Sequence, residues 1–144
     1  LVAVSDFVIA SEESSFGFTE TKIGFVPAIV SVFLTKKIGE GKAKELLLTA
    51  EIFDAKKAQE IGLITEVCKQ ESLLERTEEF INHLLANNSS HAMNATKTLL
   101  SKISNLSFDD ALKLAAETNA KVRSSEDCKK GIAAFLEKKK VLWN

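Results

Sequence analysis

The apolar residues of the chain follow two different spacings, which predict a few short strands and then many helices. The run 7–10 is typical of a short strand, the polar residues 11–15 predict a turn, and 15–18 can form a second strand. Beyond residue 27 the apolar positions repeat at helical spacing, interrupted by an extended segment at 63–67. The pattern therefore predicts a mostly helical chain with few strands.

Residues that commonly start or stop helices bound the predicted helical segments. Pro27 stands at the expected first helical residue, and Gly39 follows the end of the same segment. Asp54, Ser107 and Ser124 can each cap the start of a later helix. The predicted helices are 28–38, 41–49, 55–61, 71–86, a segment through 92–103, 108–123 and a last segment after Ser124. In helix 108–123 the positions expected to face inward are Leu112, Ala115, Ala116 and Val122.

The predicted strands are too few to form a stable sheet by themselves. A two-stranded sheet is marginal without further strands or a packed helix, and its unpaired edges attract other strands. The chain also begins at Leu1 rather than at a methionine, inside the apolar run 1–4. We therefore expect a segment or a partner outside this chain to complete the sheet.

Composition bounds the class of protein without identifying it. The 144 residues suffice for one compact domain, and 45% hydrophobic with 27% charged residues fits a globular protein. A formal net charge of -1 gives no global attraction to nucleic acid or to an anionic membrane, and no apolar run reaches the length of a membrane span. Cys68 and Cys128 are too few for a disulfide framework or a zinc site, so a cytoplasmic protein is expected.

Glu20 is the candidate acid–base group, because it lies in an apolar segment broken by glycines. The apolar residues expected to raise its pKa are Phe16, Phe18, Ile23, Phe25 and Val26. Gly17 and Gly24 permit close approach of the backbone to a ligand. A helix opened by Pro27 leaves free N–H groups, beginning with that of Ala28. The alternative is a solvated glutamate, which the dipole of a helix start favours in any case.

Three spaced blocks of the sequence resemble the enoyl-CoA hydratase (crotonase) family, in order and over nearly the whole chain. The first block is Asp6–Glu12 with Phe16-Gly17-x-x-Glu20 and Gly24-x-x-Pro27, the second is Leu46–Thr49 with Asp54–Val67, and the third is Gly131–Lys139. The resemblance implies an α/β fold, the crotonase-like ββα spiral, of which this chain would be the C-terminal portion. Residues 1–70 would form part of the spiral core, and residues 71–144 a helical oligomerisation region.

The same resemblance implies an activity and the residues that carry it. Glu20 matches the family's second catalytic glutamate, which transfers a proton at Cα while water adds to the double bond of a 2-enoyl-CoA thioester. The N–H group of Ala28 would hold the water, and Phe18 and Pro27 would contact the substrate.

The third block is expected to contact the coenzyme A part of the substrate, so that no separate cofactor is implied. Phe135 would lie near the adenine and Lys138 near the phosphate, often at the site of a neighbouring subunit. The expected partners are therefore an acyl-CoA substrate and further copies of the chain in a homotrimer or hexamer, with neither nucleic acid nor a membrane.

Two departures from the family pattern change these expectations. The Gly-Gly-Gly-x-Glu stretch, which carries an oxyanion donor and the first catalytic glutamate, should precede Leu1, so the chain resembles a second half and is expected to be inactive or nearly so alone. The Pro-Gly-x-Gly-Gly turn of the family is replaced by Pro27-Ala28-Ile29-Val30-Ser31. This bulkier turn resembles that of methylglutaconyl-CoA hydratase, which acts on branched acyl chains.

Several alternatives remain open. One glutamate can also move a proton between two carbons, as an enoyl-CoA isomerase of the same family does. The helical region could instead be a non-catalytic assembly module. His83 and His91 have no nucleophile or ligand at useful spacing and are expected to be structural or surface residues. The lysines between 36 and 57 either form a solvated helix face or bind phosphate.

Overall fold

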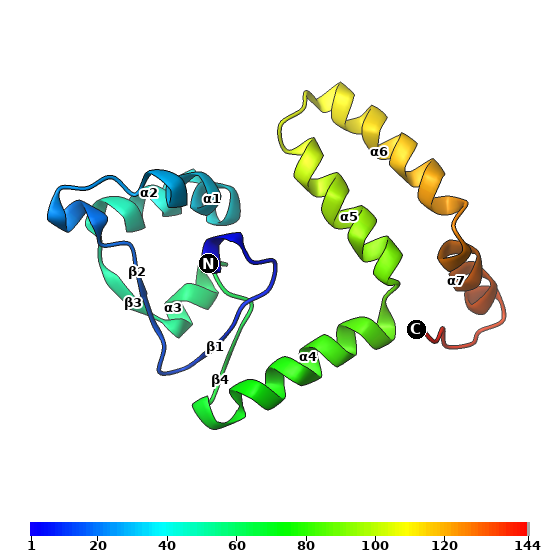
Figure 1. Ribbon diagram of the computed structural model, residues 1–144, viewed down its shortest axis with the longest axis horizontal. Helices are drawn as coiled ribbons and strands as arrows, with labels where there is room; N and C mark the ends of the chain where they lie inside the picture. The colour runs from blue at the N-terminus through cyan, green and yellow to red at the C-terminus, as the bar shows by residue number, and fades with distance from the viewer. Residues whose placement is uncertain (144) are drawn as a thin grey trace. The chain divides into compact units, whose positions relative to one another are not determined.

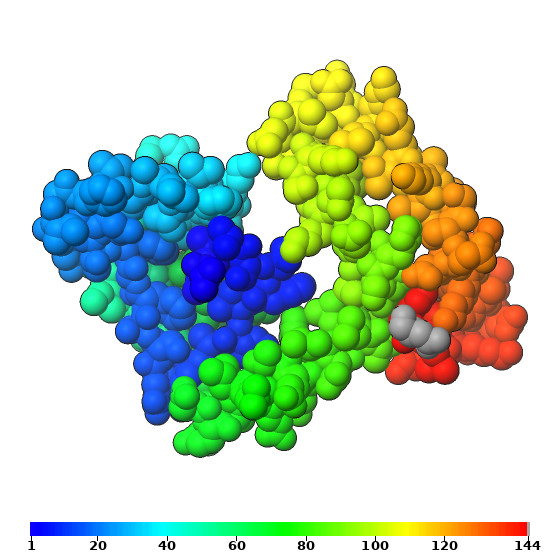
Figure 2. All heavy atoms as spheres, viewed as in Figure 1, coloured from blue at the N-terminus to red at the C-terminus, as the bar shows by residue number. Residues whose placement is uncertain are grey.

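The computed structural model describes residues 1–143, and the chain forms two compact units, Leu1–Glu78 and Glu79–Asn144. Helix α4 (Leu73–Asn87) begins in the first unit and continues into the second. In Figure 2 the atoms of the first unit, coloured blue to green, pack against one another. No helix within residues 1–143 combines the length and the apolar character needed to cross a bilayer.

The first unit combines short strands with three helices and three 3-10 turns. Its elements are η1 (Val2–Val4), β1 (Ile9–Ser11), β2 (Ser15–Gly17), η2 (Glu20–Ile23), α1 (Ala28–Ile38), α2 (Glu40–Thr49), β3 (Ile52–Asp54), α3 (Ala55–Glu60), β4 (Glu66–Cys68) and η3 (Gln70–Ser72). Helix α1 ends at Gly39, and Asp54 caps α3 by accepting the Lys57 N–H at 2.8 Å, so both local signals are confirmed.

The strands pair within the described chain as two separate two-stranded sheets, so each strand has one partner. Strand β1 runs parallel to β4, with Ala10 opposite Val67, and β2 runs antiparallel to β3, with Phe16 opposite Phe53 (Figure 1). Strand β3 was not predicted, because its three residues carry no alternating pattern long enough to detect. Long-range pairing therefore gives each predicted strand a partner.

The core of the first unit is made of small and branched apolar residues from several elements. Leu34 of α1 and Leu63 are fully buried, and they join Ala10, Ala43, Leu47, Ala55, Ala58 and Ile64 in one cluster. The alanines permit close approach of α2 and α3 to the rest of the cluster. Figure 1 shows α1 and α2 side by side above the strands. Helix α2, which contributes Ala43 and Leu47 to this cluster, contacts η2, the turn that carries Glu20.

Charged side chains bind the first and last segments of this unit to its interior elements. Lys37 of α1 donates hydrogen bonds to the carbonyl oxygens of Val2 at 2.9 Å and Ser5 at 2.8 Å. Burial lowers the pKa of Lys37, and the nearby Asp6 carboxylate opposes that shift. Arg76, at the start of α4, forms a two-point ion pair with Glu66 of β4, and hydrogen bonding to Arg76 lowers the pKa of Glu66.

The second unit continues with α5 (Ser90–Ile103), α6 (Phe108–Arg123) and α7 (Glu126–Leu136). Helices α5 and α6 pack against each other, as Figure 1 shows. Ser107 caps α6 as predicted, whereas α7 is capped by Ser125 instead of the predicted Ser124. Ser125 is the cap because its hydroxyl oxygen accepts a hydrogen bond from the N–H of Cys128 at 3.2 Å.

The prediction of the inward face of α6 is partly wrong. Ala115 and Val122 are half-buried, but Leu112 is 55% exposed and Ala116 is exposed too. Helical spacing shows which residues share a stripe, whereas the width of the neighbouring surface decides how many of them are covered. Leu112 therefore belongs to an exposed apolar edge of the second unit.

Ser89 joins the starts of two helices that are far apart in sequence. Its hydroxyl oxygen accepts the N–H of Ala92 at 3.0 Å and so caps α5, while the hydroxyl donates to Asp127 in the first turn of α7. Ser89 is only 6% exposed, so water cannot readily replace either bond. One hydroxyl thus serves both as a helix cap and as a link between α5 and α7.

Replacing Ser89 with alanine is expected to lower the free energy of unfolding by about 1–3 kcal/mol, from the lost cap and the lost charge-assisted bond. Urea unfolding followed by circular dichroism measures the change. Ser101→Ala is the matched control, because the Ser101 hydroxyl is exposed and donates to Thr98 O at 2.8 Å within α5. Equal stability of the two variants would contradict the linking role of Ser89.

Candidate active site

Glu20 is the first residue of η2, the single 3-10 turn between β2 and α1. The turn is closed by the N–H of Phe25, which donates to Glu20 O at 3.0 Å, and by Gly24, whose N–H donates to Thr21 O at 3.2 Å. Gly24 has φ 75°, a conformation that residues with a side chain rarely adopt. The glycine noted in the sequence is therefore needed for the turn that presents Glu20.

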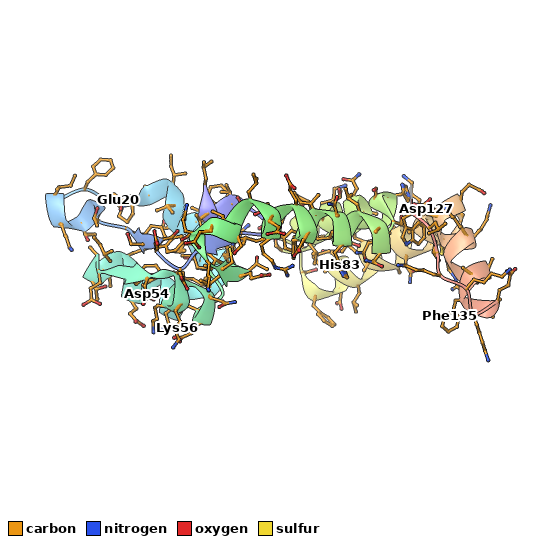
Figure 3. All side chains as sticks on the ribbon, turned by 90° about the horizontal axis from the view of Figure 1, so that it is seen from below. Glu20, Asp54, Lys56, His83, Asp127 and Phe135 are labelled. Carbon is orange, nitrogen blue, oxygen red and sulfur yellow. The ribbon has the colours of Figure 1, made fainter. Side chains whose placement is uncertain are left out.

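The carboxylate of Glu20 has one oxygen in an unusual environment. Glu20 as a residue is half-buried, but its Oε2 atom is buried and has no hydrogen-bond partner within residues 1–143. A buried carboxylate oxygen without a donor costs free energy, so it needs a specific explanation. Figure 3 shows Glu20 on the light-blue segment that carries η2. This Oε2 atom, which can still accept a hydrogen bond, is the most distinctive chemical feature of the first unit.

The apolar surroundings predicted for Glu20 are only partly present. Phe16 and Phe18 pack against the core cluster, and the Phe16 ring stacks on Phe53 with centroids 6.0 Å apart. Ile23, Phe25 and Val26, in contrast, are 83%, 66% and 68% exposed. The tight turn of η2 directs these three side chains outward, which sequence proximity alone does not reveal. They form an exposed apolar edge beside Glu20.

The backbone at Pro27 and Ala28 differs from the expected helix start. Pro27 is the N-cap residue, not the first helical one, with φ -73° and ψ 58°. These angles close an inverse γ-turn in which the Ala28 N–H donates to Val26 O at 2.7 Å. The Ala28 N–H predicted to be free is therefore already bonded. The N–H groups of Ile29 and Val30 follow it in the first turn of α1, where helix geometry provides no acceptor.

Phe135 and Lys138 lie in the second unit, whereas Phe18, Glu20, Pro27 and Ala28 lie in the first. Phe135 is 81% exposed and stands clear of the α7 ribbon in Figure 3. The N–H of Lys138 donates to Phe135 O at 3.1 Å.

Lys138 holds an unusual backbone conformation at the end of α7. Its φ is 54°, and the N–H of the next residue, Lys139, donates to Ala134 O at 2.9 Å. With the bond from Lys138 to Phe135, this is a Schellman motif, a position that usually takes glycine. The motif sets the direction of the chain at Lys138 and leaves its ammonium group exposed.

The other candidates from the sequence have ordinary partners. Lys42 pairs with Glu45 at 2.6 Å and Lys44 with Glu40 at 2.5 Å, which favours the solvated-face interpretation of these lysines over phosphate binding. His83 is exposed on α4, where Asn87 Nδ2 lies 3.3 Å from its Nδ1. Within residues 1–143 no cluster of three or more His, Cys, Asp or Glu side chains is placed to hold a metal ion.

A separate cavity of about 380 Å³ lies in the second unit and contains none of the predicted site residues. Its walls include Ser89, Asp127, Ile132 and Trp143. Trp143 is held by Lys130, whose Nζ donates to Leu142 O at 2.5 Å and lies 5.6 Å from the indole ring centre. No sequence pattern indicated this cavity, because its walls come from three separate segments between Asn87 and Trp143.

Comparison with known proteins relates the whole chain to one family. All residues, 1–144, match the family model described as "Enoyl-CoA hydratase/isomerase". A Thermus thermophilus protein named as an enoyl-CoA hydratase is 39% identical over 139 residues, covering 96% of this chain and 54% of the relative. The "Trans-2-decenoyl-[acyl-carrier-protein] isomerase" of Streptococcus mutans is 29% identical over 141 residues, covering 97% of this chain and 53% of the relative.

A solved structure extends the similarity to the fold. The crystal structure of an enoyl-CoA hydratase from Shewanella pealeana superimposes with a TM-score of 0.84 at 36% identity, covering 99% of this chain and 53% of that one. The predicted crotonase-like α/β fold class is thereby confirmed. The chain spans about half the length of the relatives that it matches.

Proposed function

We propose that this chain, which belongs to the enoyl-CoA hydratase/isomerase family, supplies the proton-transfer carboxylate of a site for 2-enoyl-CoA thioesters. The observation that carries the proposal is the buried Oε2 of Glu20, which has no hydrogen-bond partner within residues 1–143. A buried acceptor without a donor is suited to a water molecule or to the proton of a substrate. In hydration, the water oxygen bonds to Cβ of the substrate and a proton is added at Cα, so that one water is consumed.

The other predicted residues have definite parts in this proposal. Phe18, packed against the core, would form an apolar wall for the acyl chain. The buried Pro27 would fix the direction in which α1 begins. The bonded N–H of Ala28 would have to be shared between Val26 O and a bound water, and the next N–H, of Ile29, offers a second donor.

Phe135 and Lys138 are proposed to contact the coenzyme A part of the substrate. An exposed aromatic ring can stack on adenine, and an exposed ammonium group can pair with phosphate. Both side chains are exposed in the second unit, as such contacts require. We assign coenzyme A to the substrate and propose no separate cofactor.

A branched acyl chain is the proposed substrate subclass. Ala28, Val30 and Ser31 stand where the family pattern has glycines, and Ala28 is exposed at the start of α1. The turn resembles that of methylglutaconyl-CoA hydratase. A bulkier turn changes the shape of the pocket floor, so acyl-chain preference is the property it should alter.

Isomerisation is the second candidate reaction, favoured by the similarity to the Streptococcus mutans isomerase. A single carboxylate can take a proton from one carbon of an enoyl thioester and return it to another. Assembly is the third property proposed: the exposed apolar residues Phe108 and Leu112 of the second unit suit contact with further copies in a trimer or hexamer. An assembly module without catalysis would use the same surface.

The protein purified from its natural source is expected to hydrate crotonyl-CoA, seen as loss of the conjugated enoyl thioester absorbance and formation of 3-hydroxybutyryl-CoA. A branched substrate, 3-methylglutaconyl-CoA, is expected to react faster than crotonyl-CoA. Formation of 2-enoyl-CoA from 3-hexenoyl-CoA, without hydration, would instead establish isomerisation. Oligomers in light scattering that neither bind CoA nor turn over any substrate would favour the assembly module and contradict the proposal.

A further inference from the structure

Thr21 follows Glu20 directly and connects η2 to the core of the first unit. Its Oγ1 donates a hydrogen bond to the carbonyl oxygen of Leu47, 3.3 Å away and 26 residues further along the chain. Leu47 lies in the last turn of α2 and is only 9% exposed. Carbonyl groups in the last turn of a helix have no N–H partner within that helix, so the Thr21 hydroxyl supplies a donor to a carbonyl that helix geometry leaves unpaired.

The remaining bonds of η2 are local and cannot fix the turn to the rest of the fold. They run from Lys22 N to Thr19 O, from Gly24 N to Thr21 O and from Phe25 N to Glu20 O. The apolar residue of the turn, Ile23, is 83% exposed and contributes little packing. Within residues 1–143, the Thr21–Leu47 bond is therefore the polar connection between η2 and another element.

A connection of this kind is needed because the position of Glu20 is costly. The buried, unpaired Oε2 would gain free energy by moving into water, and the half-exposed turn could allow that movement. We infer that Thr21 is a positioning residue, whose hydrogen bond to the α2 carbonyl holds η2 so that the Glu20 carboxylate stays at the reaction site. The inference rests on the proposed function, since it assigns Thr21 a role that acts through Glu20.

Thr21→Val tests this, because valine keeps the shape of the side chain and lacks the hydroxyl. We expect kcat to fall by about tenfold with little change in KM, since a misplacement of about 1 Å can cost up to about 10²-fold in rate. Thr21→Ser, which keeps the donor, is expected to restore most of kcat. Thr96→Val is the matched control, because the Thr96 hydroxyl donates to Ala92 O at 2.8 Å inside α5, and its kcat should be unchanged.

A double substitution separates positioning from a general effect on structure. In the Glu20→Gln background, Thr21→Val should cause no further loss of activity, because residues that act through one another are not additive. An additional tenfold loss in that background, or equal kcat for Thr21→Val and Thr96→Val, overturns the inference.

Hydrogen exchange keeps the test independent of the proposed function. The Phe25 amide, which closes the η2 turn, should exchange faster in Thr21→Val than in the unchanged protein or in Thr21→Ser. Full activity of Glu20→Gln would refute the catalytic assignment of Glu20 alone, and the exchange rate of Phe25 would then decide whether Thr21 holds the turn. Unchanged exchange at Phe25 would show that it does not.

Discussion

Glu20→Gln is expected to reduce the hydration of crotonyl-CoA by about 10²–10⁴-fold, the usual contribution of a positioned acid–base group. Glutamine has nearly the same shape as glutamate, but its amide group can neither accept nor deliver the proton that the hydration reaction transfers. The substitution acts on the one carboxylate oxygen of the site that is buried and unpaired within residues 1–143. Steady-state kinetics should show the loss in kcat, with a much smaller change in KM, because the substitution leaves the proposed substrate contacts unchanged.

The control for this substitution is Glu13→Gln, in the exposed turn after β1, which should retain full activity. The Glu20→Gln variant should also be at least as stable as the unchanged protein, because a neutral amide is less costly to bury than a carboxylate. A stable variant without activity separates chemistry from folding. A variant that hydrates crotonyl-CoA as fast as Glu13→Gln would contradict the assignment of Glu20.

Leu34→Ala is expected to lower the free energy of unfolding by about 2–5 kcal/mol, the range for a buried leucine that leaves a cavity. Leu34 has 0% exposure and packs in the cluster that connects α1, α2 and α3. The loss is a large fraction of the stability of an ordinary domain. Urea unfolding measured by circular dichroism gives its size.

Leu48→Ala is the matched control for Leu34, since Leu48 lies on α2 of the same unit and is 74% exposed. Its substitution should change the stability by less than about 0.5 kcal/mol. The cluster described for the first unit would be wrong if both leucine variants had the same urea midpoint. A large effect of Leu48 alone would show that this surface is covered in solution.

The helix boundaries were predictable because the signals that set them act over three or four residues. Asp54 and Ser107 cap the helices that follow them, and Gly39 follows the end of α1, as the sequence indicated. The error at the start of α7 is one residue, where two adjacent serines carry the same signal and only geometry selects Ser125. The strand β3 was missed because three residues give no usable period.

The sequence nominated residues for the candidate site but did not predict their geometry. The sequence singled out Glu20, and the motifs around it led to the family. Both follow from residue types and their spacing, which can be read directly from the sequence. No sequence feature connected Thr21 with Leu47, since 26 residues separate the two groups. The outward direction of Ile23 and Phe25 likewise depends on the turn and not on their apolar character.

The sequence by itself determined the helical segments, the candidate carboxylate Glu20 and the family resemblance. The tertiary structure alone decided that the strands find partners within the chain, that Oε2 of Glu20 is buried without a donor, and that the Ala28 N–H is already bonded to Val26 O. The physical reason is range: caps and helical periods are local, whereas burial and strand pairing depend on segments brought together from distant parts of the chain.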